Sequence, residues 1–135
     1  MPRLMSVAFT EQAVIERRKT VTRRKGWKFL KVGDHLTLCR KVMGRKPGEP
    51  LVRIAEVEVV SVYQERLSEI CRYDVTHNRE EEVAREGFPG MSPEEFVRRF
   101  FIEAQGMTAD DVVTRIEFRK VPGSERVAVQ ESLAL

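Results

Sequence analysis

The sequence predicts an α+β fold: a small, mostly antiparallel β-barrel of five or six strands, decorated by about three helices. Two observations predict this class. Apolar and polar residues alternate over residues 35–42, 51–63 and 110–121, which indicates half-buried strands. Between the last two of these runs, residues 78–106 carry the start and stop signals of two helices. Strands interrupted by helices in this order fit a small decorated barrel.

One domain accounts for the whole chain, residues 1–135, with a core at about residues 4–121 and a tail at 122–135. The composition is 41% apolar and 33% charged, which is typical of a globular protein. No apolar run is long enough for a membrane span, and the first residues do not form a signal peptide, so we expect a cytoplasmic protein. Cys39 and Cys71 are then expected as thiols in or near the core.

The N-terminal elements are a strand, a helix and a basic strand. Residues 4–9 predict the first strand, and Thr10 is placed to cap a helix that continues to Lys19. In the basic run at residues 17–25, six of nine residues are cationic. The other three are β-branched and favour a strand. We expect this run to stay outside the core, because uncompensated charges are costly to bury.

Strand alternation divides the basic run between two faces. One face carries Thr20, Thr22 and Arg24, and the other carries Val21 and Arg23. A lysine, a threonine hydroxyl and several guanidinium groups then meet in one small region. Such a region suits phosphate binding or acyl chemistry.

The middle of the chain contains a turn, a loop and a bent strand. Gly33 and Asp34 predict the corner of a turn before the strand at residues 35–42. Residues 44–50 hold two prolines and two glycines and predict a basic loop. In the long strand at 51–63, the apolar face changes at Val60, which predicts a bulge or a bend.

Two helices follow, each with a cap. The first has a cap formed by Asn78 with Glu81 and stops at Gly87. The second has the strongest start signal in the chain, which consists of Ser92 at the N-cap, Pro93 at the first helical position and Glu95 in a capping box. This helix is expected to end at Gly106.

The faces of these helices predict what they bury. In the second helix, Phe96, Phe100, Phe101 and Ala104 form a stripe at helical spacing, which we interpret as core and not as a ligand site. In the first helix, residues 80–82 are three consecutive glutamates, which we interpret as a solvated helix start.

Charge is distributed unevenly along the chain. Residues 1–60 hold 14 Lys/Arg and 6 Asp/Glu, a net of +8, and residues 61–135 hold 10 and 15, a net of −5. This asymmetry indicates a surface that faces a polyanion, or else two halves that pair their charges with each other. Residues 127–129 predict an edge strand that could pair with a second copy, so we expect a monomer or a weak homodimer.

Metal and cofactor sites are not expected. His35 and His77 are far apart and have no partners at ligand spacing. The chain has no glycine-rich phosphate loop and no nucleophile–histidine–acid motif.

Four segments resemble the ASCH domain family, whose β-barrel is similar to the PUA fold of RNA-modifying enzymes. They are residues 19–24 (KTVTRR), 31–34 (KVGD), 86–88 (EGF) and 114–118 (TRIEF). The resemblance covers residues 4–121 and includes the signature GxKxxTxR, matched by Lys19, Thr22 and Arg24. Arg17 occupies the position where the signature has glycine. We expect this difference to alter the turn into the strand or to narrow the cleft, because arginine disfavours the backbone angles of glycine.

The resemblance implies an RNA-related function. Most members of the family are proposed RNA-binding modules, and others are associated with ribonuclease activity. A small bacterial subgroup resembles amidohydrolases that remove the acetyl group from N4-acetylcytidine. The lysine, threonine and glutamate of that subgroup would correspond here to Lys19, Thr22 and Glu86.

The residues themselves support two readings of this site. In the first, Thr22 is a nucleophile and Lys19 is its base, with a pKa lowered by desolvation and by the guanidiniums of Arg17, Arg18, Arg23 and Arg24. Glu86 would then donate a proton to the leaving amine. In the second, Lys19 and Arg24 bind phosphate, Thr22 is an ordinary strand residue and Glu86 forms a salt bridge.

Nucleic-acid binding is the leading hypothesis. Lys25, Lys28 and the basic residues around them would follow a sugar-phosphate backbone. Trp27, Phe29 and Tyr63 are candidates for stacking on a base, although Trp27 and Phe29 could instead fill the end of the barrel. We therefore expect RNA or a nucleoside as the ligand, in RNA-related regulation or processing, with an amidohydrolase or a ribonuclease as alternatives.

Overall fold

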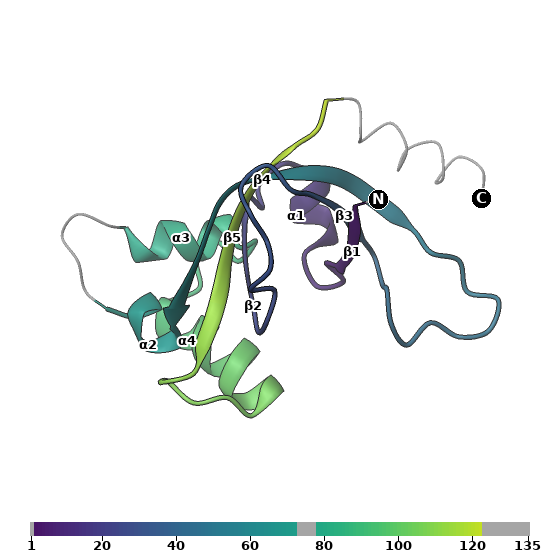
Figure 1. Cartoon of the computed structure of the whole chain (residues 1–135). Helices are drawn as coiled ribbons and strands as arrows, with labels where there is room; N and C mark the ends of the chain where they lie inside the picture. The colour runs from purple at the N-terminus through teal and green to yellow at the C-terminus, as the bar shows by residue number, and fades with distance from the viewer. Residues whose placement is uncertain (1, 73–77, 123–135) are drawn as a thin grey trace.

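The computed structural model describes residues 2–72 and 78–122, which form one mixed five-stranded sheet with helices packed against it (Figure 1). The strands lie in the order β1-β3-β4-β5-β2. Their bounds are Arg3–Ser6 (β1), Val21–Arg24 (β2), His35–Cys39 (β3), Arg53–Arg66 (β4) and Val112–Lys120 (β5). Only β1 and β3 run parallel. The predicted α+β class is confirmed, and the edge strand predicted at residues 127–129 lies outside the described residues.

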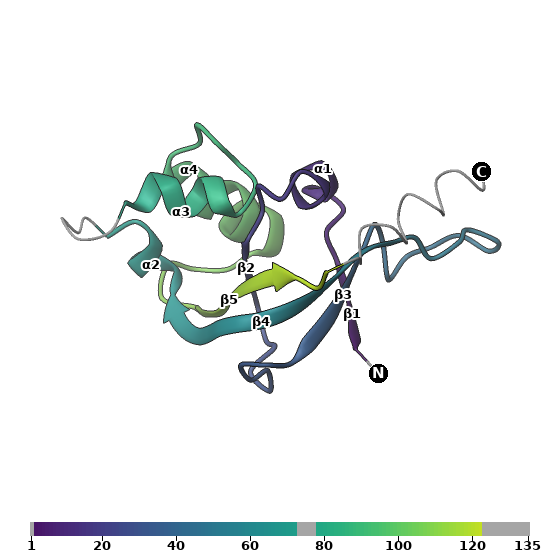
Figure 2. The ribbon, with the colours of Figure 1, turned by 90° about the horizontal axis from the view of Figure 1, so that it is seen from above.

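The described residues contain four short α-helices and one π-helix. These are Glu11–Ile15 (α1), Leu67–Ile70 (α2), Arg79–Arg85 (α3), Pro93–Val97 (α4) and the π-helix Arg98–Glu103 (η1). Figure 2 shows α1, α3 and α4 on the same side of β4. The sequence patterns did not predict α2, because four residues are too few for a helical period to appear.

The long strand β4 gives the sheet its curl. It arches across the molecule in Figure 1. Its pairing with β5 shifts register between Val59 and Ser61, which leaves Val60 as the extra residue of a bulge. Val59 is buried and Val60 is exposed. The bend predicted at Val60 is therefore confirmed.

The two outermost strands of the curled sheet, β1 and β2, approach each other. No ladder joins them among the described residues, because β1 pairs with β3 and β2 pairs with β5. A side chain bridges them instead: Arg24 Nη2 donates a hydrogen bond of 2.6 Å to the carbonyl oxygen of Ser6. We call this junction the β1–β2 seam.

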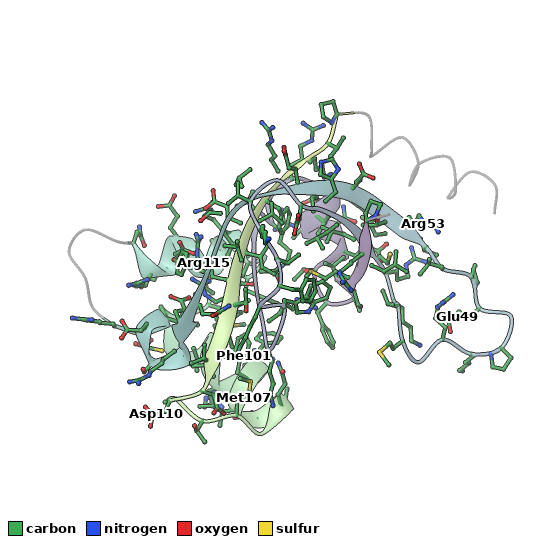
Figure 3. The ribbon with its side chains drawn as sticks, viewed as in Figure 1. Glu49, Arg53, Phe101, Met107, Asp110 and Arg115 are labelled. Atoms are coloured by element: carbon green, nitrogen blue, oxygen red, sulfur yellow. The ribbon has the colours of Figure 1, made fainter. Side chains whose placement is uncertain are left out.

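Two apolar cores lie at the two ends of the arch. The first core contains residues of β1, β3, the first half of β4 and the second half of β5, among them Met5, Leu36, Val57 and Ile116. The second core joins α2, α3, α4 and η1 to the start of β5. Figure 3 shows two of its members, Phe101 and Met107, close together beside β5.

Both predicted helix caps are confirmed. The Asn78 side chain accepts a hydrogen bond from the Glu81 amide, and the Ser92 side chain accepts one from the Glu95 amide. Gly87 ends α3 with a φ of +110°, and a Cβ there would lie 2.9 Å from the Thr10 methyl carbon. Glycine is required at this position, because it brings the end of α3 against the start of α1.

The first helix is shorter than predicted. α1 ends at Ile15 and does not continue to Lys19. The Arg17 amide bonds to the carbonyl of Val14 and the Arg18 amide to that of Ala13, which is the Schellman pattern of helix termination. Arg17 occupies the left-handed position of this motif, with a φ of +62°. Arg17 thus adopts the backbone conformation that glycine favours.

Thr10 takes the N-cap position of α1, but its side chain makes no cap hydrogen bond. In the later helix, Phe96 and Phe101 are buried as predicted, and Phe100 is half-buried. The prediction for Ala104 is wrong, because this residue is exposed. The π-helix has more residues per turn than an α-helix, which rotates Ala104 away from the core.

Candidate functional site

A cavity of about 470 Å³ lies beside β2, between the β1–α1 connection and the aromatic helices. Its polar wall contains Lys19, Thr22, Arg23, Arg24 and Glu86. Five phenylalanines line it: the exposed Phe9 on the β1–α1 connection and, on the aromatic wall, Phe88, Phe96, Phe100 and Phe101. The structure therefore brings together all three residues of the predicted catalytic set and two of the predicted guanidiniums. We call this the Lys19 cavity.

Lys19 lies two residues before the first residue of β2 and is only 5% exposed. Its Nζ donates a hydrogen bond of 2.6 Å to the backbone carbonyl of Glu86 and lies 3.4 Å from the Glu86 carboxylate. Burial lowers the pKa of Lys19 to about 8, even though the Glu86 carboxylate opposes this effect. The Arg24 and Arg23 charges act in the same direction as burial and contribute to this value. The direction agrees with the sequence prediction, and burial is the main cause.

Glu86, at the C-terminal end of α3, is held from two sides. Its second carboxylate oxygen accepts a hydrogen bond of 3.0 Å from Arg23 Nη1. Arg23 also donates to Glu65 at 2.6 Å and to Glu82 at 3.2 Å. Burial alone would lower the pKa of Arg23, but these carboxylates raise it overall. The prediction that the basic run stays outside the core is wrong for Lys19 and Arg23, because three carboxylates compensate their charges.

A second buried arginine completes this network. Arg115 on β5 lies opposite Arg23 on β2, and it donates a hydrogen bond of 2.8 Å to Glu82. Figure 3 shows Arg115 on the α3 side of β5. Burial would raise the pKa of Glu82, but its bonds with Arg115 and Arg23 lower it overall. The prediction that Glu82 is solvated is wrong, because the α3 face that carries it packs on the sheet.

Glu65, Glu82 and Arg115 were missed by the sequence reasoning. One signal was available for Glu82, which lies four residues before Glu86 and therefore on the same helix face. No local signal identifies Glu65 or Arg115, because their partners come from other elements. All three carboxylates in the network come from the acidic half of the chain, so the two halves pair their charges here.

The predicted nucleophile, Thr22, faces the Lys19 cavity and is 2% exposed. Its hydroxyl oxygen accepts a hydrogen bond of 3.1 Å from Arg24 Nε. Within residues 2–72 and 78–122, no acceptor lies within reach of the hydroxyl proton, and Lys19 bonds to Glu86 instead of Thr22. Burial lowers the pKa of Arg24, although the nearby Glu86 carboxylate opposes this effect. The Thr22 hydroxyl is thus available to a molecule in the cavity.

The remaining predicted ligand-binding residues lie outside the Lys19 cavity. Arg17, Arg18, Lys25 and Lys28 are exposed, and Arg18 pairs with Glu16 at 2.7 Å. Tyr63 is 46% exposed on β4, where the Arg115 guanidinium lies 5.3 Å from its ring centre. Trp27 is half-buried against the first core and lines a different cavity, together with Lys25.

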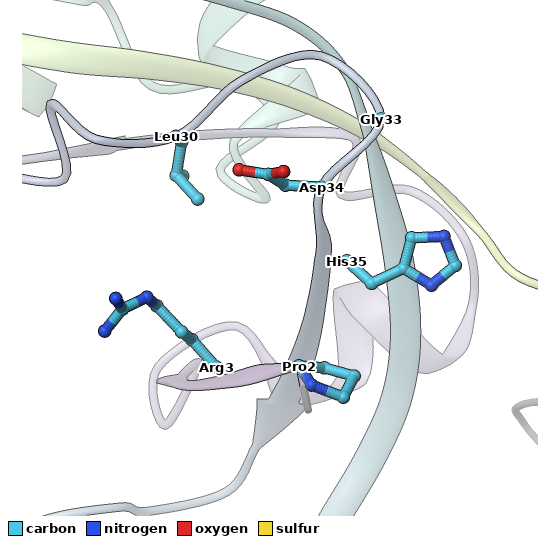
Figure 4. Close-up of a pocket in the computed structure, with 6 residues that line it drawn as sticks. All are labelled: Pro2, Arg3, Leu30, Gly33, Asp34 and His35. Atoms are coloured by element: carbon cyan, nitrogen blue, oxygen red, sulfur yellow. The ribbon is translucent and has the colours of Figure 1, made fainter.

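A further cavity, of about 490 Å³, lies beside the start of β3 (Figure 4). It contains none of the predicted catalytic residues. Asp34 uses its carboxylate to accept a hydrogen bond from the Lys31 amide, and His35 lies 3.3 Å from Glu56. We assign no chemistry to this cavity.

Other predictions concern metals, thiols and membranes. Among the described residues, no group of three or more metal-ligating side chains is close enough to hold an ion, and His77 lies outside those residues. Cys39 is buried and Cys71 is half-buried, as predicted. In the part of the chain that the structure describes, no helix has the length and apolar character that a membrane crossing requires.

Comparisons with known proteins identify the fold. No protein-family model matches the sequence, and no curated protein matches it significantly. Among solved structures, protein EF3133 from Enterococcus faecalis, of the family model DUF984, is 16% identical with a TM-score of 0.59, over 90% of this chain and 77% of that one. An ASCH domain from Lactobacillus crispatus is 14% identical with a TM-score of 0.56, over 87% and 79%.

A third structure, the ASCH protein from Zymomonas mobilis, is 13% identical with a TM-score of 0.53, over 97% of this chain and 78% of that one. At such identities the similarity concerns the fold. The chain therefore has the fold of ASCH domains, a curled PUA-like barrel with helices packed on it, as the resemblance implied.

Proposed function

We propose that the Lys19 cavity binds a nucleoside, either free or within RNA. The observation that carries this proposal is the convergence of Lys19, Thr22 and Arg24 on a cavity whose other wall is aromatic. A volume of about 470 Å³ lies within the range of small-molecule sites. Cationic and hydroxyl donors suit the polar edge of a base or a phosphate, and aromatic rings suit its face.

The aromatic wall is built to receive a flat group. The rings of Phe88 and Phe100 lie 4.4 Å apart between centroids, and both residues are half-buried, so part of each ring faces the cavity. Phe96 packs behind them at 5.8 and 5.7 Å and fixes their positions. A base that entered would stack on rings already in place, which reduces the entropy cost of binding.

A second candidate function is hydrolysis of an N4-acylated cytidine, and the buried position of Lys19 favours it. A lysine whose pKa is about 8 is partly neutral near physiological pH and can accept a proton. Neutral Lys19 would remove the proton of Thr22 as its oxygen attacks the acyl carbon. The protonated lysine would then return that proton to the departing amine nitrogen as the carbon–nitrogen bond breaks. Water would hydrolyse the acyl ester and release the acid.

Glu86 takes a positioning role in this scheme. Its carbonyl and carboxylate both contact Lys19, and Arg23 bonds to the remaining oxygen. Because Lys19 and Arg23 already occupy both carboxylate oxygens, we assign Glu86 the role of orienting Lys19 and not that of donating a proton to the amine. Lys19 and Thr22 share no hydrogen bond without a ligand, and such contacts often form only when substrate binds. No contact among the described residues favours a ribonuclease.

Two measurements test both functions. Calorimetry with cytidine and N4-acetylcytidine measures binding, and chromatography after incubation with N4-acetylcytidine measures release of cytidine. For the enzyme, Thr22→Ala is expected to keep nucleoside binding within a few-fold and to abolish turnover. Binding without turnover by the native protein would exclude the hydrolase for this substrate. If the protein binds neither cytidine nor N4-acetylcytidine, the proposed function is contradicted.

A further inference from the structure

A second basic and aromatic site lies between the β2–β3 connection and β1, next to the Lys19 cavity but separate from it. It is a cavity of about 540 Å³ lined by Arg3, Lys25, Trp27 and Phe29, with Pro2 and Leu4 at its edge. It shares no lining residue with the Lys19 cavity. The rings of Trp27 and Phe29 lie 5.5 Å apart between centroids. We call this group the Trp27 platform.

The platform presents an aromatic surface that is partly exposed, because Trp27 is half-buried and Phe29 is exposed. Phe29 is 50% exposed, and the Arg3 guanidinium lies 4.2 Å from its ring centre. Figure 4 shows the Arg3 side chain pointing away from the His35 ring. A phenylalanine ring that is half exposed to solvent leaves part of its apolar surface unburied in the free protein. A ligand with a flat face would recover it.

The backbone that presents Trp27 is unusual. Trp27 has a φ of +56° and follows Gly26, which has a φ of +82°. A bulky residue with a positive φ is a backbone outlier that costs free energy. The Thr114 hydroxyl donates a hydrogen bond to the Gly26 carbonyl and fixes this turn to β5. The fold thus holds the indole ring in place at a conformational cost.

The charged side chains that line the platform itself, Arg3 and Lys25, are both cationic. Among the described residues, no carboxylate lies within ion-pair distance of Arg3, Lys25 or Lys28. The cavity beside the start of β3, which shares Arg3 with the platform, adds one carboxylate, Asp34, that accepts a hydrogen bond of 2.9 Å from the Lys31 amide. Cations without a carboxylate partner beside aromatic rings are the combination by which proteins hold single-stranded nucleic acid, through phosphates and base faces together.

The platform and the Lys19 cavity are neighbours along the β1–β2 seam. Ser6 and Arg24 line the Lys19 cavity, and Leu4 and Lys25 line the platform. Leu4 and Ser6 are two residues apart on β1, a distance of about 7 Å along a strand. An extended polynucleotide that runs along the seam would pass from one site to the other.

We propose that the Trp27 platform stacks a base of single-stranded RNA, next to the nucleoside that enters the Lys19 cavity. This inference takes its ligand class from the proposed function. It specifies a polynucleotide as the ligand, because the two sites share no lining residue and a ligand that occupies both must continue along the seam from one to the other.

Fluorescence tests this directly, because Trp27 is the chain's single tryptophan. A short single-stranded oligocytidylate is expected to quench Trp27 emission at saturation, and cytidine at the same base concentration is expected to leave it unchanged. Phe29→Ala should weaken oligocytidylate binding by about tenfold, as loss of a stacking partner does. The matched control is Met43→Ala, which truncates another exposed apolar side chain and should leave the affinity unchanged.

Salt dependence tests the cations. Lys25→Gln and Lys28→Gln should each lower the slope of log affinity against log salt by about 0.7, the value for one phosphate of a single strand. Arg66→Gln, an exposed arginine at the far end of β4, should leave the slope unchanged.

Two results would overturn the inference. One is oligocytidylate affinity that is unchanged in Phe29→Ala. The other is equal quenching by polyglutamate, which would make the platform a surface for acidic peptides. The proposed function is judged separately by calorimetry with cytidine. Trp27 quenching by the oligonucleotide without cytidine binding would support the platform and contradict the nucleoside cavity.

Discussion

The ammonium group of Lys19 lies 2.6 Å from the carbonyl oxygen of Glu86 and 3.4 Å from the carboxylate of the same residue. One glutamate thus contacts the buried lysine through both its main chain and its side chain. The carbonyl fixes the position of the ammonium group, and the carboxylate supplies charge. These two effects can be separated by substitution, because only the second depends on the side chain.

Glu86→Gln is expected to lower the pKa of Lys19 below its value of about 8. The substitution keeps the carbonyl contact but removes the negative charge that opposes the effect of burial. The titration of the Lys19 ammonium group, followed by NMR, measures this change directly. Glu95→Gln, which alters a carboxylate away from the cavity, should leave the titration unchanged. An unchanged or raised Lys19 pKa in Glu86→Gln would contradict the electrostatic role.

Stability should rise with pH between about pH 8 and 10.5 because of Lys19. The folded-state pKa lies below the ordinary value of 10.5, so the unfolded chain binds more protons across this window. Below pH 8 the buried ammonium group destabilises the fold by about 3 kcal/mol. Lys19→Met should remove this part of the slope.

Denaturant unfolding of both proteins at several pH values measures the difference. The slopes from Tyr63 and Cys71, whose pKa values burial raises, are common to both proteins and cancel. Parallel stability curves for the two proteins from pH 8 to 10.5 would show that Lys19 does not titrate as described.

Arg17→Gly is expected to stabilise the protein by about 1 kcal/mol. Arg17 holds a φ of +62° at the left-handed position that ends α1, and glycine takes this conformation without the steric cost of a Cβ. Urea unfolding measures the change. Arg18→Gly, one residue later, is the matched control and should be neutral or destabilising. Equal changes in the free energy of unfolding for the two substitutions would contradict the explanation from the left-handed backbone conformation of Arg17.

Glu82→Gln is expected to destabilise the protein by about 3 kcal/mol. Glu82 accepts hydrogen bonds from both Arg23 and Arg115, and its loss leaves two buried guanidiniums undercompensated. The control is Glu81→Gln, which alters the exposed neighbour in the same helix and should change stability by less than about 0.5 kcal/mol. A similar small effect of both substitutions would show that the network contributes little.

Local patterns predicted much of this fold. The caps at Asn78 and Ser92 depend on residues three positions apart, so the sequence displays them directly. The bulge at Val60 is visible because a change of face interrupts strict alternation. The same alternation placed Thr22 and Arg24 on one face, and the structure joins them by a hydrogen bond.

The environment of the site could not be predicted in the same way. The partners of Lys19 and Arg23 lie 42 to 67 positions away in the chain, on β4 and α3. Sequence reasoning therefore placed the cations in solvent. The length of α1 was also misjudged, because arginine was not expected in the left-handed conformation that Arg17 adopts.

The sequence by itself determined the strands, the caps and the cluster of lysine, threonine and arginine on β2, because these depend on neighbours along the chain. The tertiary structure alone decided that Lys19 is buried, that Glu65, Glu82 and Arg115 compensate Arg23, and that aromatic rings face the cavity. The physical reason is that burial and charge pairing are set by distances in space. Here those distances follow from the pairing of β2 with β5 and the packing of α3 on the sheet.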